Sequence, residues 1–443
     1  MIQYLPNIIF AVLLVVAATV FVTNAKKILR NIRLGQPITR WDRKDERWKT
    51  MARVAFGQSK MTVRPIPAFL HLIVYIGFLL INIEVIEILI DGLFGTHRVL
   101  SFMGGFYNFM IGFFEILAFG VILACVLFFI RRNIVHVRRL VMGELNGWPK
   151  TDANLILLME VSFMVALLLM NGADATLQAR QYPHFVEAGG FPISSWLTQP
   201  LFENLPSDTV LVFERAAWWF HIIGIFFFAN YLYYSKHLHI ILAFPNTWFS
   251  KLEPKAEFNN LASVTNEVKM MMDPNADPYA MPAEGTAEEP STFGAKDIFD
   301  LNQVQLLNAY TCTECGRCTS ECPANLTGKK LSPRKIMMDT RDRIEDVSRI
   351  LDANNGQWKD DGKTLVNDYI SAEELWACTS CNACTQACPV NIDPLSIIVD
   401  LRRYLVMEQS AAPQELNLMM ANIENNGAPW QFNTADRLNW AND

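Results

Sequence analysis

Five apolar stretches, each long enough to cross a lipid bilayer, set the strongest limit on what this 443-residue chain can fold into. A membrane-spanning helix needs about 20 such residues. The stretches cover residues 5–24, 66–90, 104–130, 153–172 and about 212–244. In lipid, only closed barrels and helices satisfy all their backbone hydrogen bonds, so these stretches predict a five-helix bundle. The first stretch lacks the basic start and the cleavage site of a signal peptide, and we interpret it as a span.

Basic residues are distributed unevenly between the loops that join these stretches. Residues 25–65 contain twelve Lys or Arg and residues 131–152 contain five, whereas the other two loops contain one each, Arg98 and Arg180. The positive-inside rule predicts that the two basic loops face the cytoplasm. The N-terminus then lies outside, and everything after the fifth span lies inside. We expect a multi-pass protein of a bacterial inner (cytoplasmic) membrane, surrounded by lipid.

The hydrophobicity falls sharply after the fifth span, which indicates a second, soluble part. We expect a transmembrane domain over residues 1–250, a linker over 251–295 rich in Pro, Asn, Glu, Met and Ala, a mostly helical domain over 296–410 and a tail over 411–443. The predicted fold class is therefore all-α. The net charge of −6, without a basic patch interleaved with aromatic residues, gives no support for nucleic-acid binding.

Eight of the nine cysteines lie in the soluble part and form one motif twice. CxxCxxCxxxCP comprises Cys312, Cys315, Cys318 and Cys322 in its first copy and Cys378, Cys381, Cys384 and Cys388 in its second. In this motif the first three cysteines hold one cubane cluster and the fourth reaches the other cluster. We therefore assign Cys312, Cys315, Cys318 and Cys388 to one 4Fe-4S cluster. The second 4Fe-4S cluster takes Cys378, Cys381, Cys384 and Cys322.

Structural zinc and disulfides are the alternatives for these cysteines. Zinc sites usually take two separated CxxC pairs, and disulfides are typical of secreted domains, so both fit less well. Small residues within the motifs let backbone amides approach the sulfur atoms. They are Gly316 in the first copy and Ser380, Asn382 and Ala383 in the second. Cys125, in the middle of the third span, is expected to be a buried core residue.

The words CTECGRCTSECPANLTGKKLSPRKI and ACTSCNACTQACPVNIDPLSIIVDLRRYLV resemble the helical dicluster domain of the heterodisulfide-reductase-related family. The resemblance covers about a quarter of the chain and implies a cytoplasmic α-helical ferredoxin domain. Many relatives also carry, or are encoded beside, a cysteine-rich CCG domain. This chain has no Cys-Cys pair and no cysteine after Cys388, so such a module would come from a partner.

Four histidines lie in or beside the predicted spans, where a histidine is a functional hypothesis by default. They are His71 in the second span and His221, His237 and His239 in or at the end of the fifth. His71 and His239 share a depth and could bind one haem b axially. On a continuous helix His239 faces the same way as His221, five turns earlier, while His237 faces roughly 160° away. Hydrogen bonding within the bundle remains the alternative.

The same layout, with SKHLHIILAFPN after a histidine-bearing fifth helix, resembles the five-helix membrane subunit of respiratory nitrate reductase. In that subunit two helices supply two histidines each for two haems. Here Ile81 and Asn82 stand where a second histidine of the second helix would be expected. A second haem is therefore left open, and His221 could instead contact quinone or water.

Acidic residues in or near the spans could accept the protons of a quinone reaction, which needs two protons for two electrons. They are Glu84, Glu87, Glu115 and Glu160. Pairing between helices explains each of them equally well. The side of the membrane on which quinone binds is left open.

We therefore expect an oxidoreductase: the membrane-anchored electron-transfer subunit of a quinone-linked respiratory system. It would work between the quinone pool and a soluble redox partner, either a flavoprotein or a CCG-domain iron-sulfur protein. No nucleotide-binding glycine motif is present, so substrate chemistry and catalytic residues are expected on that partner. The alternatives are a quinol-driven reductase of a soluble acceptor such as a disulfide, and a non-catalytic redox sensor or assembly scaffold.

Overall fold

The computed structural model describes residues 4–255, 257–274 and 293–442, and over these residues the protein is helical. The described part contains no β-strand, only two isolated bridges, Gln36 with Asn302 and Val366 with Ile370. This confirms the all-α prediction.

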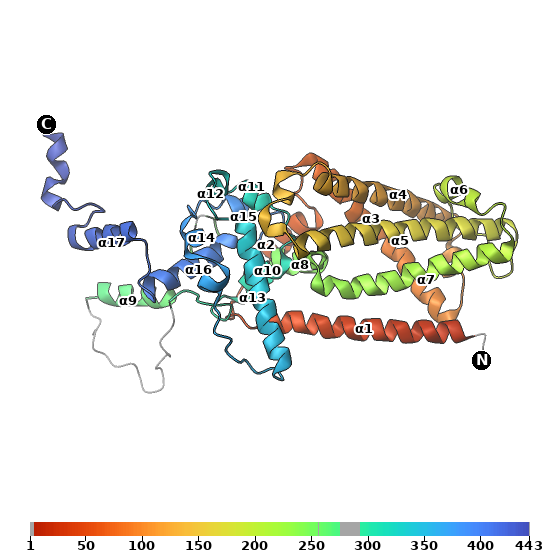
Figure 1. Ribbon diagram of the computed structural model, residues 1–443, viewed down its shortest axis with the longest axis horizontal. Helices are drawn as coiled ribbons and strands as arrows, with labels where there is room; N and C mark the ends of the chain where they lie inside the picture. Colours follow the sequence, from red (N-terminus) through yellow and green to blue (C-terminus); the bar gives the residue numbers. More distant parts are fainter. Residues whose placement is uncertain (1–3, 256, 275–292, 443) are drawn as a thin grey trace.

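Five long helices form an elongated bundle at one end of the molecule (Figure 1). They are α1 (Leu5–Ile32), α3 (Pro65–Phe94), α4 (Gly105–Asn133), α5 (Trp148–Ala179) and α7 (Ser207–Tyr231). All five are long and apolar enough to cross a membrane, in agreement with the sequence. Each begins or ends beyond its apolar stretch, because the polar residues at its ends continue the helix toward the loops.

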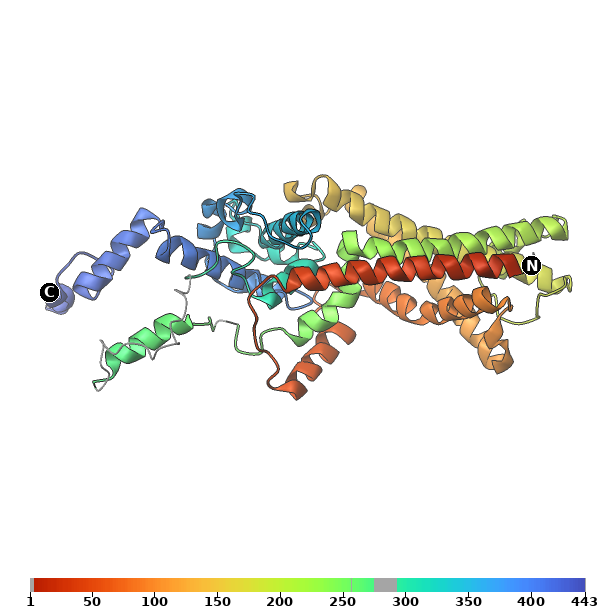
Figure 2. The ribbon, with the colours of Figure 1, turned by 90° about the horizontal axis from the view of Figure 1, so that it is seen from below.

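The helices pack as neighbours around the bundle, with α5 lying between α4 and α7, and α3 against α4. The first helix, α1, lies at the edge between α3 and α7 (Figure 2). Gly92 of α3 allows this close approach, because a Cβ atom there would lie 2.7 Å from the ring of Phe10 on α1. Most of α1 is exposed in the isolated protein, as expected of a helix that faces lipid.

The fifth predicted span is wrong in one respect: it is not a continuous helix to residue 244. The helix α7 ends at Tyr231, two short 3-10 turns follow, and α8 (His239–Trp248) begins in a new direction. Ser235 is extended at the break. A carboxylate on α5 fixes this turn, because Asp152 accepts hydrogen bonds from the Tyr231 hydroxyl at 2.6 Å and the Lys236 amide at 3.1 Å. No pattern of apolar residues predicts such a tertiary bond.

The soluble domain is a compact group of helices at the end of the bundle from which α8 emerges (Figure 1). Its helices are α10 (Gln303–Thr311), α11 (Arg317–Ser320), α12 (Pro323–Leu326), α13 (Pro333–Ala353), α14 (Ala372–Trp376), α15 (Ala383–Ala387) and α16 (Pro394–Met407). A short turn (Leu365–Tyr369), with left-handed backbone at Asn367, precedes α14. The last turns of α1 enter this domain: Ile28 joins its hydrophobic core, and the Asn31 amide donates to the Tyr310 hydroxyl at 2.8 Å.

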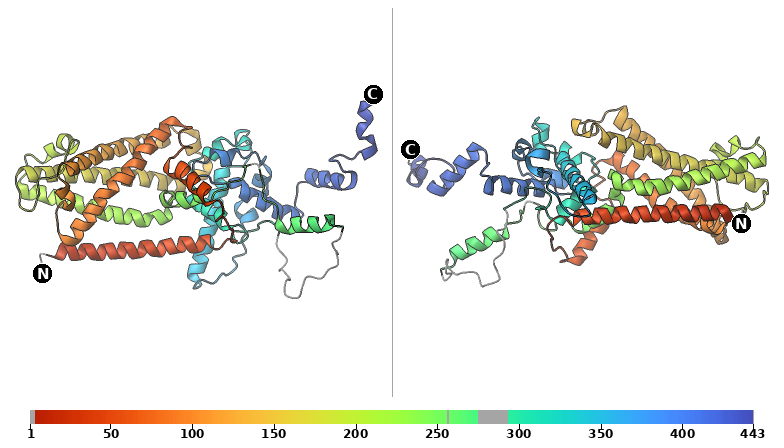
Figure 3. Two further views of the ribbon diagram at one scale, coloured as in Figure 1. Left: turned by 180° about the vertical axis from the view of Figure 1, so that it is seen from behind. Right: turned by 60° about the horizontal axis from the view of Figure 1, so that its bottom comes forward.

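Short helices lie in the basic loop and in the linker. The basic loop contains α2 (Lys44–Met51) and the linker contains α9 (Ala262–Met272). Residues 275–292 of the predicted linker lie outside the described residues. The tail forms α17 (Gln414–Asn426) and a 3-10 helix (Thr434–Ala441). Figure 3 shows α9, α17 and the C-terminus projecting away from the soluble domain.

Candidate metal centres

The two cysteine motifs fold into the same loop. Each places left-handed backbone at its third and fifth positions: Glu314 and Gly316 in the first copy, Ser380 and Asn382 in the second, with φ between 55° and 69°. The Ser320 amide donates to the Gly316 carbonyl at 3.1 Å, and the Gln386 amide makes the equivalent bond to Asn382 at 3.0 Å. The repeat seen in the sequence is therefore a repeat of backbone geometry.

Gly316 is required at its position for two reasons. Its φ of 69° favours glycine, and a Cβ atom there would lie 2.5 Å from the Arg334 guanidinium and 2.9 Å from the Arg139 carbonyl. The small residues were predicted to admit backbone amides to the sulfur atoms, and one such bond is present, from the Ser380 amide to Cys378 Sγ at 3.4 Å. The left-handed conformation of Glu314 was not anticipated.

Each loop leads into a capped helix. Ser332 caps α13 and Asp393 caps α16, each with proline at the first helical position. Threonines tie the loops to these caps: Thr319 Oγ1 lies 2.9 Å from Ser332 Oγ, and the Thr385 hydroxyl donates to Asp393 at 3.0 Å. Because helix N-termini carry partial positive charge, both loops sit in surroundings suited to an anionic group.

The sequence predicts that the fourth cysteine of each motif joins the cluster held by the other motif. The placement of one set of four cysteines agrees with this. Cys322 of the first copy lines a small cavity together with Cys378, Cys381 and Cys384 of the second. Apolar side chains, among them Leu331, Leu395 and Ile398, form the other walls. We call this group the distal set.

The other four cysteines also come together. The thiols of Cys312, Cys315 and Cys388 are the main electrostatic neighbours of Cys318, followed by Cys384 of the distal set. The Ile392 amide donates to Cys388 Sγ at 3.2 Å. Cys312, Cys315, Cys318 and Cys388 are called the proximal set, because they lie closer to the bundle.

Burial raises the pKa of Cys312 and of Cys384 to about 12 and that of Cys388 to about 11. Ligation needs thiolates, so the charge of bound iron must offset this cost. All nine cysteines are free thiols. The described residues hold no group of three or more His, Cys, Asp or Glu side chains placed for a single metal ion. Each set offers the four thiols that a 4Fe-4S cluster takes.

The proximal set lies against the loops of the bundle. Lys60 donates to the Cys388 carbonyl at 3.0 Å, and Arg139 donates to the carbonyl of Cys315. Asn246 of α8 donates to the Val390 carbonyl at 2.8 Å. The distal set is turned toward solvent, where Cys381 is exposed.

A buried group of charges joins the two parts of the protein. Lys236, at the break after α7, forms ion pairs with Glu314 of the first motif and, at 3.9 Å, with Asp152. Arg341 of α13 pairs with the same Glu314 at 2.7 Å. The sequence analysis missed these residues, because none of them is unusual until the fold brings them together.

Two of the predicted haem ligands face each other. The ring centroids of His71 and His239 are 6.5 Å apart. Two imidazole nitrogens bound about 2 Å from one iron would place the ring centroids about 6 Å apart, so the pair fits axial ligation. Nδ1 of His71 lies 3.1 Å from Gln58 Oε1, and Nδ1 of His239 lies 3.1 Å from the Lys236 carbonyl. Both rings therefore keep Nε2 available for a metal.

His221 and His239 do not share one helical face, contrary to the prediction, because α7 and α8 are separate helices. His237 was expected to face away. Its ring nevertheless lies 5.4 Å from that of His239, centroid to centroid. His221 is 1% exposed, with Nδ1 3.0 Å from the Phe163 carbonyl and Nε2 without a hydrogen-bond partner.

The acids in the bundle fall into two kinds. Glu87 accepts hydrogen bonds from the Leu100 amide and the Tyr107 hydroxyl, and Glu115 accepts from Asn171 and Ser194. These contacts favour the structural interpretation for both. Neither carboxylate oxygen of Glu84 has a hydrogen-bond partner.

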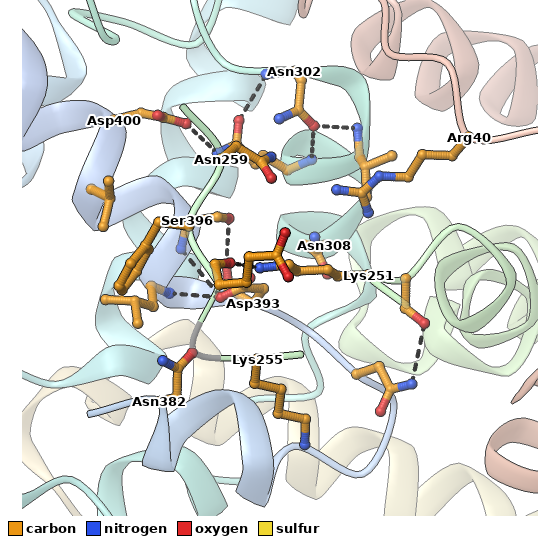
Figure 4. Close-up of a pocket in the computed structure, with 18 of the residues that line it drawn as sticks. Arg40, Lys251, Lys255, Asn259, Asn302, Asn308, Asn382, Asp393, Ser396 and Asp400 are labelled. Atoms are coloured by element: carbon orange, nitrogen blue, oxygen red, sulfur yellow. Dashed lines mark hydrogen bonds between the residues drawn. The ribbon is translucent and has the colours of Figure 1, made fainter. Parts of the chain in front are cut away.

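A polar pocket lies beside the distal set, between the start of the linker and α16 (Figure 4). Its lining includes Arg40, Asn308, Asn382 and Asp393. It contains no cysteine, and Asp393 is already engaged in capping α16.

Comparison with known proteins supports the iron-sulfur interpretation. Residues 311–392 match the family model of a 4Fe-4S dicluster domain. The "Probable iron-sulfur-binding oxidoreductase FadF" of Bacillus subtilis is 29% identical over an alignment that covers 98% of this chain and 61% of that protein. The "EtfAB:quinone oxidoreductase" of Syntrophomonas wolfei is 26% identical, with 88% and 53% covered.

A "Probable membrane-anchored ferredoxin" of Chromohalobacter salexigens is 33% identical over 34% of this chain and 24% of that protein. Subunits of heterodisulfide reductases match the cluster region as well. No solved structure matches. The chain spans little more than half the length of the first two relatives. These findings support an iron-sulfur, oxidoreductase-like electron-transfer subunit, anchored in a membrane by several helices.

Proposed function

We propose that this protein transfers electrons between a soluble redox partner and the quinone pool. The distal and proximal sets would each hold a 4Fe-4S cluster, and His71 with His239 would hold one haem b. When bound, these groups supply one-electron transfer, and quinone takes up two electrons with two protons. One observation carries the proposal: Lys60, in the loop that leads to His71 on α3, donates to the Cys388 carbonyl at 3.0 Å, and its own carbonyl accepts from Arg317 of the first motif at 2.9 Å.

The three sites follow one another from solvent to membrane. The distal set is nearest to solvent through Cys381 and would face the partner. The proximal set contacts the loop before α3 through Lys60. His71 lies on the second turn of α3, directly after that loop. This order suits a protein that passes single electrons from the surface of its soluble domain into its membrane bundle.

The charges around the two cysteine sets favour electron flow toward the membrane. The main electrostatic neighbours of the proximal cysteines include four cations, Arg139, Arg317, Lys60 and Arg341, and one acid, Glu314. Those of the distal set include one cation, Arg402, and one acid, Asp393. Positive charge stabilises the reduced form of an anionic group, so the proximal site should have the higher potential.

The name of one relative indicates the chemical class of the soluble partner and of the electron acceptor. One of them is named for EtfAB and quinone, which supports a protein donor and a quinone acceptor here. The soluble partner would be a flavoprotein or a CCG-domain iron-sulfur protein. The basic loops adjoin the soluble domain, which supports a cytoplasmic domain and an N-terminus outside in a bacterial inner membrane.

The matches to heterodisulfide reductase subunits favour a second candidate, in which quinol drives reduction of a soluble disulfide. That function needs electrons to leave through the distal set. A distal site with a potential above the proximal one would favour it, whereas the charges described above favour the reverse order.

The proposal predicts the metal content of detergent-purified protein. We expect about eight non-haem irons and eight labile sulfides per chain, with one b-type haem by pyridine haemochrome. His71→Ala and His239→Ala should each remove the haem signal while leaving the cluster iron. His136→Ala is the control, since His136 is exposed in the loop after α4. Haem retained in both variants would contradict the ligand assignment, and about four irons would contradict the paired clusters.

A further inference from the structure

A buried polar network occupies the end of the bundle opposite the soluble domain, and one member of it lacks a hydrogen-bond partner. Glu84 of α3 is 3% exposed, and no donor reaches either of its carboxylate oxygens. The nearest cation is Arg98, whose Nη1 lies 3.9 Å from Glu84 Oε1. A buried, charged carboxylate without a hydrogen-bond donor costs free energy, and taking up a proton removes that charge.

Arg98 does not donate a hydrogen bond to Glu84, because its guanidinium already donates to three other residues. Nε donates to Asp174 at 2.6 Å, Nη2 to Asn171 at 2.9 Å and Nη1 to the Tyr107 hydroxyl at 3.2 Å. The other acids that face Glu84 are Glu87, Glu115 and Asp174, from α3, α4 and α5. Each of these three accepts hydrogen bonds, so Glu84 differs from all its acidic neighbours.

The network continues from Asp174 to the end surface. Asp174 pairs with Nε2 of His97 at 3.2 Å. The His97 ring lies 6.1 Å from that of His184, centroid to centroid. His184 is exposed in the loop after α5. Titratable groups thus lead from the bundle interior to an exposed loop after α5. Figure 2 shows the N-terminus at the end of the bundle opposite the soluble domain.

We propose that Glu84 exchanges protons between a quinone bound in the bundle and the surface opposite the soluble domain, through Asp174, His97 and His184. This rests on the proposed function, which supplies quinone and electrons. Quinone takes two electrons, one at a time from the cluster side, and two protons, and leaves as quinol. Glu84 gives each proton to a quinone oxygen and is reprotonated from the His97 side. In quinol oxidation the same steps run in reverse.

The test uses the full protein in liposomes that contain menaquinone and a pH-sensitive dye in the lumen. Dithionite added outside reduces only molecules whose soluble domain faces outward. For the native chain we expect the lumen to become alkaline as quinone is reduced. Glu84→Gln should slow quinone reduction at least ten-fold and abolish the change in lumen pH, with iron and haem content unchanged. Glu203→Gln, the same change in an exposed loop at the same end, should behave as the native chain.

The outcomes separate this inference from the function on which it rests. Quinone reduction by Glu84→Gln at the native rate, or proton uptake from the external side by the native chain, overturns the role of Glu84 and leaves the proposed function intact. A native chain that does not reduce quinone overturns both. If Glu84→Gln loses iron or haem, Asp174→Asn and His97→Gln are used instead, and a native rate with native lumen alkalinisation in both overturns the path.

Discussion

Single residues decide how the cysteine loops are built and how their surroundings are charged. The spacing of the cysteines predicts two groups of four, because the geometry of a cubane favours that spacing, and the structure places Cys322 beside the cysteines of the second motif. The left-handed Gly316 could also be anticipated from its lack of a side chain. The position of Glu314 could not, since its partners Lys236 and Arg341 are distant in the sequence.

Lys60 offers a test of the electrostatics at the proximal set. Burial, followed by the charge of Lys255, lowers the pKa of Lys60 to about 8. Below that pH its charge favours the reduced proximal site; as the pH rises through about 8 the charge is lost, so the potential should fall. A unit charge ~8 Å away at an effective dielectric of about 20 is worth roughly 2 kcal/mol, on the order of 90 mV for one electron. Partial exposure of the ammonium reduces this value.

We therefore expect Lys60→Met to lower the proximal potential by roughly 30–80 mV at pH 7 and to remove its pH dependence between about 7 and 9. Redox titration followed by electron paramagnetic resonance measures both effects. Lys329→Met, an exposed lysine after α12, is the control. A potential that is unchanged in Lys60→Met would show that its ammonium does not act on this site.

At the scale of elements, the break after α7 determines where the histidines lie. Continuous apolar stretches predict all five spans because burial in lipid requires them, and the structure contains five such helices. They do not predict the end of α7 at Tyr231, because apolar residues resume at 240–244 after the short polar stretch SKHLH. The turn depends on Asp152, which lies on α5, more than 75 residues earlier.

Removing this carboxylate should disturb the histidine pair. In Asp152→Ala the Tyr231 hydroxyl and the Lys236 amide lose their acceptor, a cost of about 1–3 kcal/mol for buried groups. We expect a lower haem-to-protein ratio and a lower midpoint of thermal unfolding. Asp208→Ala is the matched control, since Asp208 accepts from Tyr182 in an exposed position at the other end of α7. Equal haem content in both variants would contradict a role for the turn in placing His239.

At the scale of the molecule, the sequence predicts a membrane bundle and a soluble helical domain, but not how they meet. The contact is built from pairs far apart in the chain: Arg30 with Asp352 at 2.6 Å, Arg64 with Glu321 at 3.1 Å and Arg334 with Glu144 at 2.6 Å. Ion pairs between residues so far apart in the chain cannot be predicted from the sequence around either residue. Together with Ile28 in the domain core, they hold the proximal set at the end of the bundle instead of leaving it on a flexible tether.

The central claim is that electrons move between the cysteine sets and quinone through the histidine end of the bundle. The most direct test is rapid mixing of dithionite-reduced protein, freed of excess reductant, with a menaquinone analogue, while haem and cluster absorbance are recorded separately. We predict that haem is oxidised first and that cluster absorbance follows, with His239→Ala slowing cluster oxidation at least ten-fold. Clusters that are oxidised as fast without the haem, or not at all by quinone in the native chain, would contradict the account.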